Sequence, residues 1–175
     1  MFDQKPIRIQ IIGYSGSGKS TLAKILSQYL NINVLYLDNV QFYGDWQERS
    51  LLEKNNIVND FLNKNDSWVI DGNYSKVAPQ RFDLANITIF LNYNRFYCYR
   101  QCKKRYKMNL NRSRESCPCI EKFDLEFKKW ILINGRTRKN KQQHLQNLNK
   151  TKGIKLIFKN RRQLKKWLIE NNIQM

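Results

Sequence analysis

Long apolar segments and cysteines are both scarce in this sequence. No run of apolar residues approaches the ~18 residues that a membrane span needs, and residues 1–6 lack the apolar core of a signal peptide. The four cysteines, Cys98, Cys102, Cys117 and Cys119, are too few and too clustered for a secreted disulfide framework in a chain of 175 residues. We therefore expect a cytoplasmic protein with reduced thiols and no membrane partner.

Acidic residues are scarce relative to basic ones, with 14 Asp and Glu against 32 Lys and Arg, a formal net charge of +18. Such a field favours polyanions, including nucleotides and nucleic acid, without choosing among them. The basic residues are dense over residues 95–114 and continue over residues 128–141. Nonspecific nucleic-acid binding through this basic surface is one interpretation, and a merely solvated charged face is the other.

Glycine is also scarce, with seven in the chain, yet three of them lie in Gly13–Ser20, which reads G-x-x-x-x-G-K-S. In this motif backbone N–H groups cradle the phosphates of a nucleotide. The apolar, β-branched run before it, residues 7–12, predicts a strand, and the helical spacing of residues 22–26 predicts a helix. We therefore predict that the nucleotide is bound by Gly13, Ser15, Gly16, Ser17, Gly18, Lys19, Ser20 and Thr21.

The motif also assigns roles within a nucleoside triphosphate site. Lys19 is expected to reach the β- and γ-phosphates, and the Ser20 hydroxyl is expected to bind Mg²⁺. The sequence thus predicts ATP and Mg²⁺ as cofactors.

Strand-like and helix-like segments alternate along the whole chain, which predicts a single α/β domain over residues 1–175. Strands are expected at residues 7–12, 33–37, 67–70, 86–91 and 154–158, and helices near residues 19–31, 51–63, 96–108, 123–133 with a continuation after Gly135, and 162–170. This order implies a parallel sheet with helices on both faces. Ligands bind beyond the carboxyl ends of such strands, where Gly13, Asp38, Asp71 and Asn92 fall.

Two aspartates at these strand ends are candidates for chemistry. Asp71 follows the apolar residues 68–70 and is the better candidate for a metal-supporting acid beside Ser20. Asp38 is expected either to join the Mg²⁺ shell or to accept the proton of a substrate hydroxyl. For each residue, a turn-closing role is the alternative.

Arginines are expected to compensate charge during phosphoryl transfer. Arg81 is expected to face the acceptor, Arg112 and Arg114 lie in a segment predicted to fold over the nucleotide, and Arg136 and Arg138 form a second pair. The residues expected to be catalytic are thus Lys19, Asp38, Asp71, Arg112 and Arg136.

The aromatic residues divide by position. Trp68 and Trp130 are expected in the core, whereas Phe42, Tyr43 and Trp46 follow Asp38 and are placed to line an acceptor pocket. Base stacking beside positive charge is the alternative for the aromatic residues.

Two further sets of side chains suggest chemistry that we rank lower. The four cysteines could supply thiolates for zinc, but their spacing differs from paired C-x-x-C motifs, so buried thiols are the preferred interpretation. His144 follows the polar residues 141–143 and is expected at the surface.

Several segments together resemble one known family. Besides the phosphate loop, these are Leu37-Asp38 with Trp46, Trp68-Val69-Ile70-Asp71-Gly72-Asn73-Tyr74-Ser75 with Arg81, and Phe123-Asp124-Leu125-Glu126-Phe127. They are similar to adenylate-kinase-like P-loop proteins labelled DNA topology modulation proteins. The resemblance implies a three-layer P-loop fold of nucleoside-monophosphate-kinase type, with five parallel strands in the order 2-3-1-4-5 and a helical lid at about residues 109–126.

The resemblance also bears on the substrate. It implies that the acceptor contacts Asp38, Trp46, Asn73, Tyr74 and Arg81. Adenylate kinases carry Asp-Gly-Phe-Pro-Arg for AMP where this chain has Asp71–Ser75, so the acceptor stays open. We expect a kinase that transfers phosphate to a small molecule or nucleotide. The alternative is an ATP-binding protein or ATPase that acts on nucleic acid.

Overall fold

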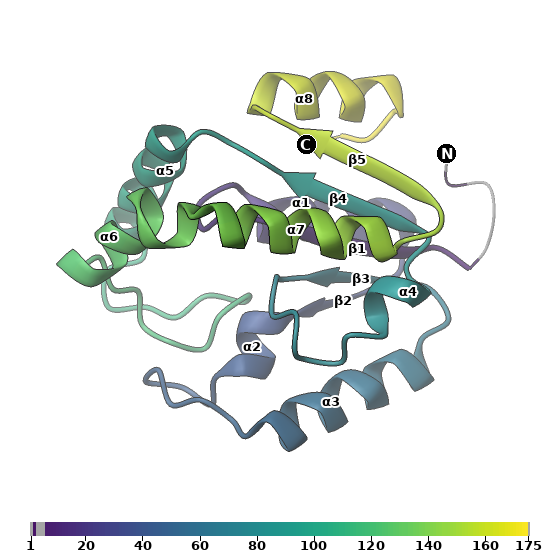
Figure 1. Cartoon of the computed structure of the whole chain (residues 1–175), viewed down its shortest axis with the longest axis horizontal. Helices are drawn as coiled ribbons and strands as arrows, with labels where there is room; N and C mark the ends of the chain where they lie inside the picture. The colour runs from purple at the N-terminus through teal and green to yellow at the C-terminus, as the bar shows by residue number, and fades with distance from the viewer. Residues whose placement is uncertain (1, 3–5, 175) are drawn as a thin grey trace.

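Five short strands form one parallel sheet in the order β2-β3-β1-β4-β5. In the computed structural model, which describes residues 2 and 6–174, they span Arg8–Gly13 (β1), Asn33–Tyr36 (β2), Trp68–Asp71 (β3), Ile87–Leu91 (β4) and Ile154–Phe158 (β5). All five predicted strands are present, and each observed boundary lies within one residue of the predicted one. The predicted strand order is confirmed. The carboxyl ends of the strands face the left side of Figure 1.

The central strands are buried on both faces because their residues are apolar on both faces. Ile9, Ile11 and Ile12 of β1 are fully buried, and every residue of β4 is buried. Gln10 is the buried polar residue of β1, and its amide nitrogen donates to the carbonyl oxygens of Ile70 and Gly72 at 3.2 and 3.0 Å. β5 lies at the sheet edge and leaves three of its five residues exposed.

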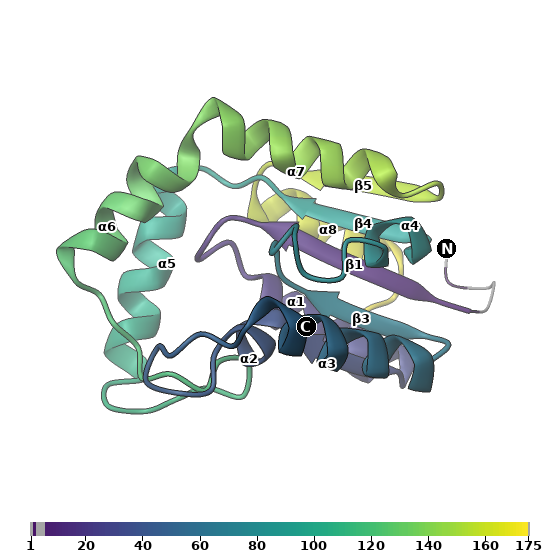
Figure 2. The ribbon, with the colours of Figure 1, turned by 60° about the horizontal axis from the view of Figure 1, so that its bottom comes forward.

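Helices cover both faces of the sheet, as Figures 1 and 2 show. They span Lys19–Leu30 (α1), Leu37–Gln41 (α2), Leu51–Lys64 (α3), Arg81–Leu84 (α4), Arg95–Met108 (α5), Leu125–Leu132 (α6), Arg138–Lys150 (α7) and Arg161–Glu170 (α8), with a 3₁₀ turn at Asn134–Arg136 (η1). α1 packs on β1, β2 and β3, while α4 and α7 lie on the opposite face, where α7 contacts β4. α8 lies on the α1 side, where the Tyr29 hydroxyl donates to the Asn171 carbonyl.

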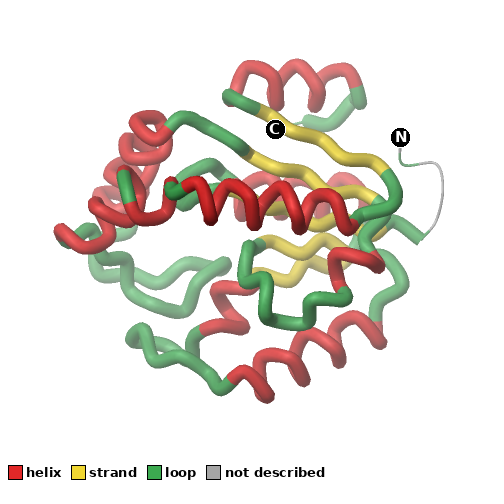
Figure 3. Tube along the Cα trace, viewed as in Figure 1, coloured by secondary structure: helices red, strands yellow, loops and turns green. Residues whose placement is uncertain are grey.

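Local side-chain signals set several helix boundaries. Ser50 and Glu53 form a capping box at the start of α3, with the Ser50 hydroxyl accepting from the Glu53 N–H at 3.2 Å. The Asp124 carboxylate accepts from the Phe127 N–H, so α6 begins at Leu125 rather than at the predicted residue 123. The long loops drawn green in Figure 3 join α2 to α3, β3 to α4, and α5 to α6.

Two expectations about burial are wrong. His144 lies on the inner side of α7 and is only 7% exposed, because its ring packs edge-on against Tyr14 with centroids 5.1 Å apart. Trp130 of α6 is 48% exposed, whereas Trp68 is buried as expected. Within the part of the chain that the structure describes, no helix combines the length and the apolar composition needed to cross a membrane.

Candidate functional site

A cavity of about 1000 Å³ opens at the carboxyl edge of the sheet. The phosphate loop forms one wall, and Asp38, Asp71 and Tyr74 line the cavity from the ends of the neighbouring strands. Side chains of α5, α8 and the segment between α5 and α6 close the other sides. The structure therefore brings the predicted polar strand ends together at one edge, as parallel-sheet topology requires.

The phosphate loop turns between β1 and α1 through three glycines with positive φ, and two of them pack tightly. A Cβ on Gly13 would lie 2.7 Å from the Leu91 carbonyl oxygen, and one on Gly16 would lie 2.4 Å from that of Cys98 in α5. Gly18, the N-cap of α1, has φ +92° and open space around it. The phosphate loop therefore packs closely against α5 at Gly16, where there is no room for a side chain.

Lys19 and Ser20 begin α1 directly behind this loop. The Lys19 ammonium donates to the Tyr14 carbonyl at 3.3 Å, and the Ser20 hydroxyl donates to Oδ2 of Asp71 at 2.6 Å. The second Asp71 oxygen, Oδ1, is buried without a hydrogen-bond partner. Burial raises the pKa of Asp71 to about 6, although the Lys19 charge opposes the shift. A hydroxyl and a carboxylate with a spare oxygen are donors that suit Mg²⁺.

Asp38 faces this pair from the second residue of α2. Its Oδ1 accepts from the Tyr74 hydroxyl at 2.8 Å, and both residues line the cavity. Burial, then the Asp38 charge, raise the pKa of Tyr74, so this phenol stays protonated and keeps donating. The hydrogen bond fixes the orientation of the carboxylate toward the cavity.

Asn73 pairs with the backbone of the phosphate loop. Its Oδ1 accepts from the Gly13 N–H at 2.9 Å, and its Nδ2 donates to the Gly13 carbonyl at 2.8 Å. Asn73 also lines the cavity, and its contact with an acceptor stays a prediction beside this structural role. Sequence reasoning assigned only the acceptor contact.

Arg81 differs from its expected acceptor role because it is fully buried. Its guanidinium donates to the Gln10 side chain at 3.0 Å and to the carbonyl of Asn73 at 2.9 Å, and it also donates to the Val77 carbonyl. Burial lowers the pKa of Arg81 to about 9. Arg81 thus holds the segment after β3 in place instead of facing the cavity.

The lid segment, residues 109–124 between α5 and α6, presents a different arginine from the one predicted. Arg112 is exposed and lies outside the lining of the cavity, whereas Arg105 and Arg114 line it. The buried Glu121 carboxylate holds both, with its Oε1 2.9 Å from Nε of Arg105 and 2.5 Å from Nε of Arg114. The sequence did indicate that an arginine of this segment would face the nucleotide, since Arg112 and Arg114 are two residues apart. It gave no sign that Glu121 would pair with Arg114.

The lid segment also contacts the opposite side of the cavity. The Trp46 indole N–H, from the loop between α2 and α3, donates to the Ile120 carbonyl at 3.0 Å. Lys24 of α1 pairs with Glu115 at 2.6 Å. Trp46 lines the cavity as expected, and it ties the acceptor-side loop to the lid segment.

A smaller cavity of about 210 Å³ adjoins the first and contains Arg136. The Arg136 guanidinium lies 3.6 Å above the centre of the Tyr14 ring, and its Nη1 donates to the Tyr93 carbonyl at 2.7 Å. Arg136 therefore supports the phosphate loop from behind, through the ring of a residue inside the motif.

The cysteines do not gather into a metal centre. All four are buried free thiols, and among the described residues no cluster of three or more His, Cys, Asp or Glu could hold a metal ion. Cys98 and Cys102 pack beneath Gly16, while the Cys119 sulfur accepts from the Trp46 N–H at 3.3 Å. The structure therefore shows four buried thiols, which was the preferred interpretation of the sequence.

The sequence matches no protein-family model and no curated protein. Solved structures are similar in fold: a shikimate kinase from Bacteroides thetaiotaomicron has a TM-score of 0.54 and 18% identity, with 95% of this chain and 96% of that chain covered. An uncharacterized protein from Eubacterium ventriosum gives 0.53 and 15%, with coverages of 95% and 98%. A deoxyadenosine kinase from M. mycoides, with products dCMP and a flexible dCDP bound, gives 0.50 and 15%, with coverages of 94% and 97%. The fold is therefore that of P-loop kinases.

Proposed function

We propose that this protein is a P-loop kinase that transfers the γ-phosphoryl group of Mg·ATP to a hydroxyl of a small acceptor. The observation that carries the proposal is the arrangement of the Ser20–Asp71 pair and Asp38 in one cavity beside the phosphate loop. A protein that only binds a nucleotide would need nothing beyond the phosphate loop. The Asp38 carboxylate, which the Tyr74 hydroxyl orients, supplies the general base that transfer to a hydroxyl uses.

On the nucleotide side, backbone N–H groups of residues 16–19 and the Lys19 ammonium bind the phosphates. Ser20 and Asp71 would hold Mg²⁺, which would supply neutralisation of negative charge on the phosphates. Arg114 faces the same cavity and compensates charge that builds up in transfer. Arg112, which points elsewhere, has no role in this proposal.

On the acceptor side, Asp38 acts as the general base. Tyr74 occupies Oδ1, which leaves Oδ2 to accept the proton of the acceptor hydroxyl. The acceptor oxygen then forms a bond to the γ-phosphorus as the bond to the ADP oxygen breaks. Phe42 and Trp46 line the cavity near Asp38 and give this side an apolar, aromatic wall.

The acceptor class stays broad. Two of the structural neighbours are named as a shikimate kinase and a deoxyadenosine kinase, so the acceptors to test include small hydroxyl-bearing metabolites and nucleosides. The competing function is a nucleic-acid-stimulated ATPase, which rests only on the resemblance of Asp71–Tyr74 and Phe123–Phe127 to DNA topology modulation proteins.

The compound that stimulates ADP release distinguishes a small-molecule kinase from a nucleic-acid-stimulated ATPase. The purified protein is incubated with Mg·ATP and, one at a time, hydroxyl-bearing metabolites, nucleosides, nucleoside monophosphates and duplex DNA. We expect one small-molecule class to raise ADP release above the ATPase background, with Lys19→Ala and Asp38→Asn abolishing the increase and the exposed-residue variant Lys64→Ala leaving it unchanged. Stimulation by DNA with no response to any small molecule would contradict the kinase proposal.

A further inference from the structure

The acceptor end of the main cavity is formed by two segments, α2 with the loop that follows it, and the residues that follow β3. We call their lining the acceptor wall, which consists of Asp38, Phe42, Trp46, Gly72, Asn73 and Tyr74. The Phe42 N–H donates to the Asp38 carbonyl at 3.2 Å, and the Tyr74 hydroxyl donates to the Asp38 carboxylate at 2.8 Å. The rings of Phe42 and Trp46 have centroids 5.2 Å apart. Three aromatic side chains thus lie around one carboxylate.

Trp46 has a strained backbone in this wall. Its φ is +63°, and Asp45 before it has φ +46°. A left-handed conformation costs a residue with a side chain roughly 1–2 kcal/mol. Burial of the indole does not offset this cost fully, because Trp46 is still 37% exposed. Strain of this kind collects at ligand sites, where the backbone directs a side chain, so we infer that the indole is placed for a ligand and not for the core.

None of the described residues in the acceptor wall is basic, although the chain has 32 Lys and Arg. The basic residues that line the cavity come from α1, α5, the lid segment and α8, and they are Lys19, Lys104, Arg105, Arg114, Arg161 and Lys165. A phosphate or carboxylate group against the acceptor wall would therefore meet the charge of Asp38 with no counter-ion from the wall.

Three basic residues close to the wall are bonded within the protein. The Arg49 guanidinium donates to two carbonyl oxygens of α2 at 2.8 and 3.2 Å. The Lys54 ammonium, in a residue that is 8% exposed, donates to the Gln41 side chain at 3.2 Å. All three nitrogens of the Arg81 guanidinium donate to protein groups. An anion here would lose hydration without gaining a counter-ion, so the wall suits an uncharged acceptor.

We propose that the acceptor is a nucleoside, whose base stacks on Trp46 and whose sugar hydroxyl faces Asp38. The inference rests on the proposed function for the transfer step and names its substrate class, while the binding itself depends only on the acceptor wall. Nucleosides are flat at the base and uncharged. Nucleoside monophosphates are anionic, and polyols and non-aromatic acids lack the flat ring that an indole face binds.

Calorimetry measures this binding without transfer. Protein saturated with Mg·ADP, which occupies the phosphate loop, is titrated with adenosine, guanosine, cytidine and thymidine, with their 5′-monophosphates, and with shikimate and myo-inositol. We expect at least one nucleoside to bind, and its 5′-monophosphate to bind at least about tenfold more weakly because its charge is repelled by Asp38. Shikimate and myo-inositol should give no binding.

Two substitutions of Trp46 isolate the stacking contribution. Trp46→Phe and Trp46→Leu both lose the hydrogen bond to the Ile120 carbonyl, but only the leucine variant loses the aromatic face. The leucine variant should therefore bind the nucleoside at least about tenfold more weakly than the phenylalanine variant. Phe96→Leu removes a ring that is 65% exposed outside the cavity and should change nothing. Circular dichroism establishes that each variant is folded.

The outcomes separate this inference from the proposed function. Equal binding by the two Trp46 variants, equal binding of a nucleoside and its monophosphate, or no nucleoside binding would overturn the inference, even if another acceptor raises ADP release. Nucleoside binding that depends on the ring at position 46 supports the inference even if no acceptor raises ADP release, in which case only the proposed function fails.

Discussion

Gly16 and Gly18 lie two residues apart in the phosphate loop, and both have positive φ, yet their surroundings differ. A Cβ on Gly16 would meet the Cys98 carbonyl oxygen at 2.4 Å, whereas one on Gly18 would meet nothing within 4 Å. Both substitutions share the conformational cost of a left-handed residue. Only Gly16→Ala adds a clash with a helix backbone, which cannot move aside as a flexible side chain could.

This difference predicts two unequal variants. Gly16→Ala should lower the free energy of unfolding by about 2 kcal/mol more than Gly18→Ala, through overpacking against α5. Urea denaturation followed by circular dichroism measures both values. Equal losses would mean that α5 does not hold the loop.

Because Arg81 is buried and bonded within the protein, its substitution should lower stability instead of acceptor affinity. Arg81→Leu leaves several buried carbonyl oxygens without their donor and should lower the free energy of unfolding by about 3 kcal/mol. Arg162→Leu, at an exposed position of α8, should have almost no effect in the same urea titration. An Arg81 variant as stable as the wild type would contradict this structural role.

His144 predicts how stability depends on pH. Its pKa is about 4 in the folded protein and ~6.5 when unfolded. Between these values the unfolded chain binds a proton that the folded chain does not, so stability falls as the pH drops from 6.5 to 4 and levels off below. Relative to His144→Gln, the wild type should lose up to about 3 kcal/mol over this range. Parallel pH profiles of the two proteins would refute a neutral buried ring.

At the scale of elements, the lid segment is attached by charges at two places. Glu121 holds Arg105 and Arg114 from a buried position, while Glu115 pairs with Lys24 at the surface. Exposed ion pairs contribute little, whereas removing one member of a buried cluster leaves its partners uncompensated. The buried cluster therefore controls where the lid segment sits.

Glu121→Gln should loosen the lid segment. Limited proteolysis should cut residues 109–124 at least about tenfold faster than in the wild type, because local opening costs less free energy. Glu115→Gln, six residues earlier, is the matched control and should be cut at nearly the wild-type rate. Equal cleavage of the two variants would count against the buried cluster as the attachment.

The sheet was predictable from the sequence, and the short elements were not. Each strand is a largely apolar segment of four to six residues between polar turns, a pattern that the local sequence shows directly. α2 and α4 have five and four residues, too few to display helical periodicity, so the sequence indicated loops there. The helix containing His144 carries polar residues on most sides, which concealed its buried face.

The site was predictable where topology alone decides position. Ser20, Asp38 and Asp71 meet because they end or follow parallel strands of one sheet. Asn73 satisfies the backbone of Gly13, which is distant in sequence, and Arg81 satisfies carbonyls of the segment just before it. A polar side chain gives no sign in the sequence of whether it turns inward. Arg114 was favoured over Arg112 by Glu121, whose burial depends on the tertiary fold.

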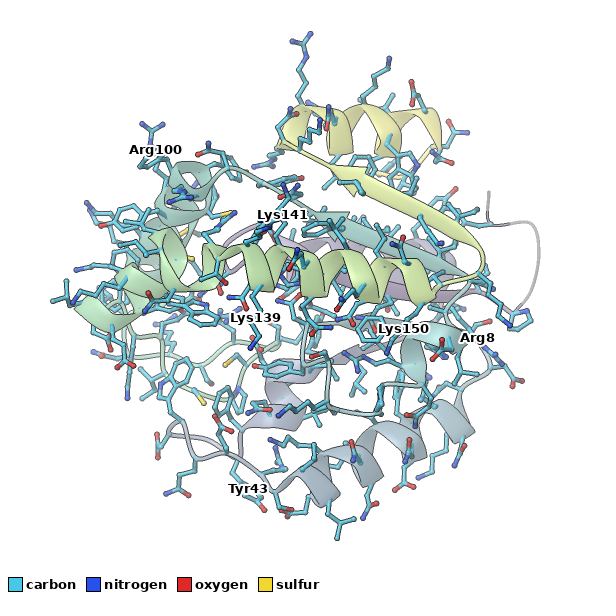
Figure 4. The ribbon with its side chains drawn as sticks, in the orientation of Figure 1. Arg8, Tyr43, Arg100, Lys139, Lys141 and Lys150 are labelled. Atoms are coloured by element: carbon cyan, nitrogen blue, oxygen red, sulfur yellow. The ribbon has the colours of Figure 1, made fainter. Side chains whose placement is uncertain are left out.

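At the scale of the whole molecule, charge is the dominant property. Basic side chains such as Arg100, Lys139, Lys141 and Lys150 project outward from α5 and α7 (Figure 4). With a net charge of +18, self-repulsion opposes the compact state unless ions screen it.

Salt should therefore stabilise this protein. Raising NaCl from ~20 to ~200 mM shortens the Debye length severalfold and should raise Tm by about 3 °C, a gain near 1 kcal/mol. Differential scanning calorimetry measures the change, with mannitol at equal osmolarity as the uncharged control. A Tm that falls with NaCl would indicate that attractive ion pairs outweigh the repulsion.

Two arms border the cavity, the loop between α2 and α3 and the lid segment, and the hydrogen bond from Trp46 to Ile120 joins them. Neither arm can swing away without breaking it, so a ligand that orders one arm has already ordered much of the other. The nucleotide and the acceptor should then bind synergistically, each raising the affinity of its companion by the same factor. Removing this hydrogen bond should weaken the coupling between the two binding events.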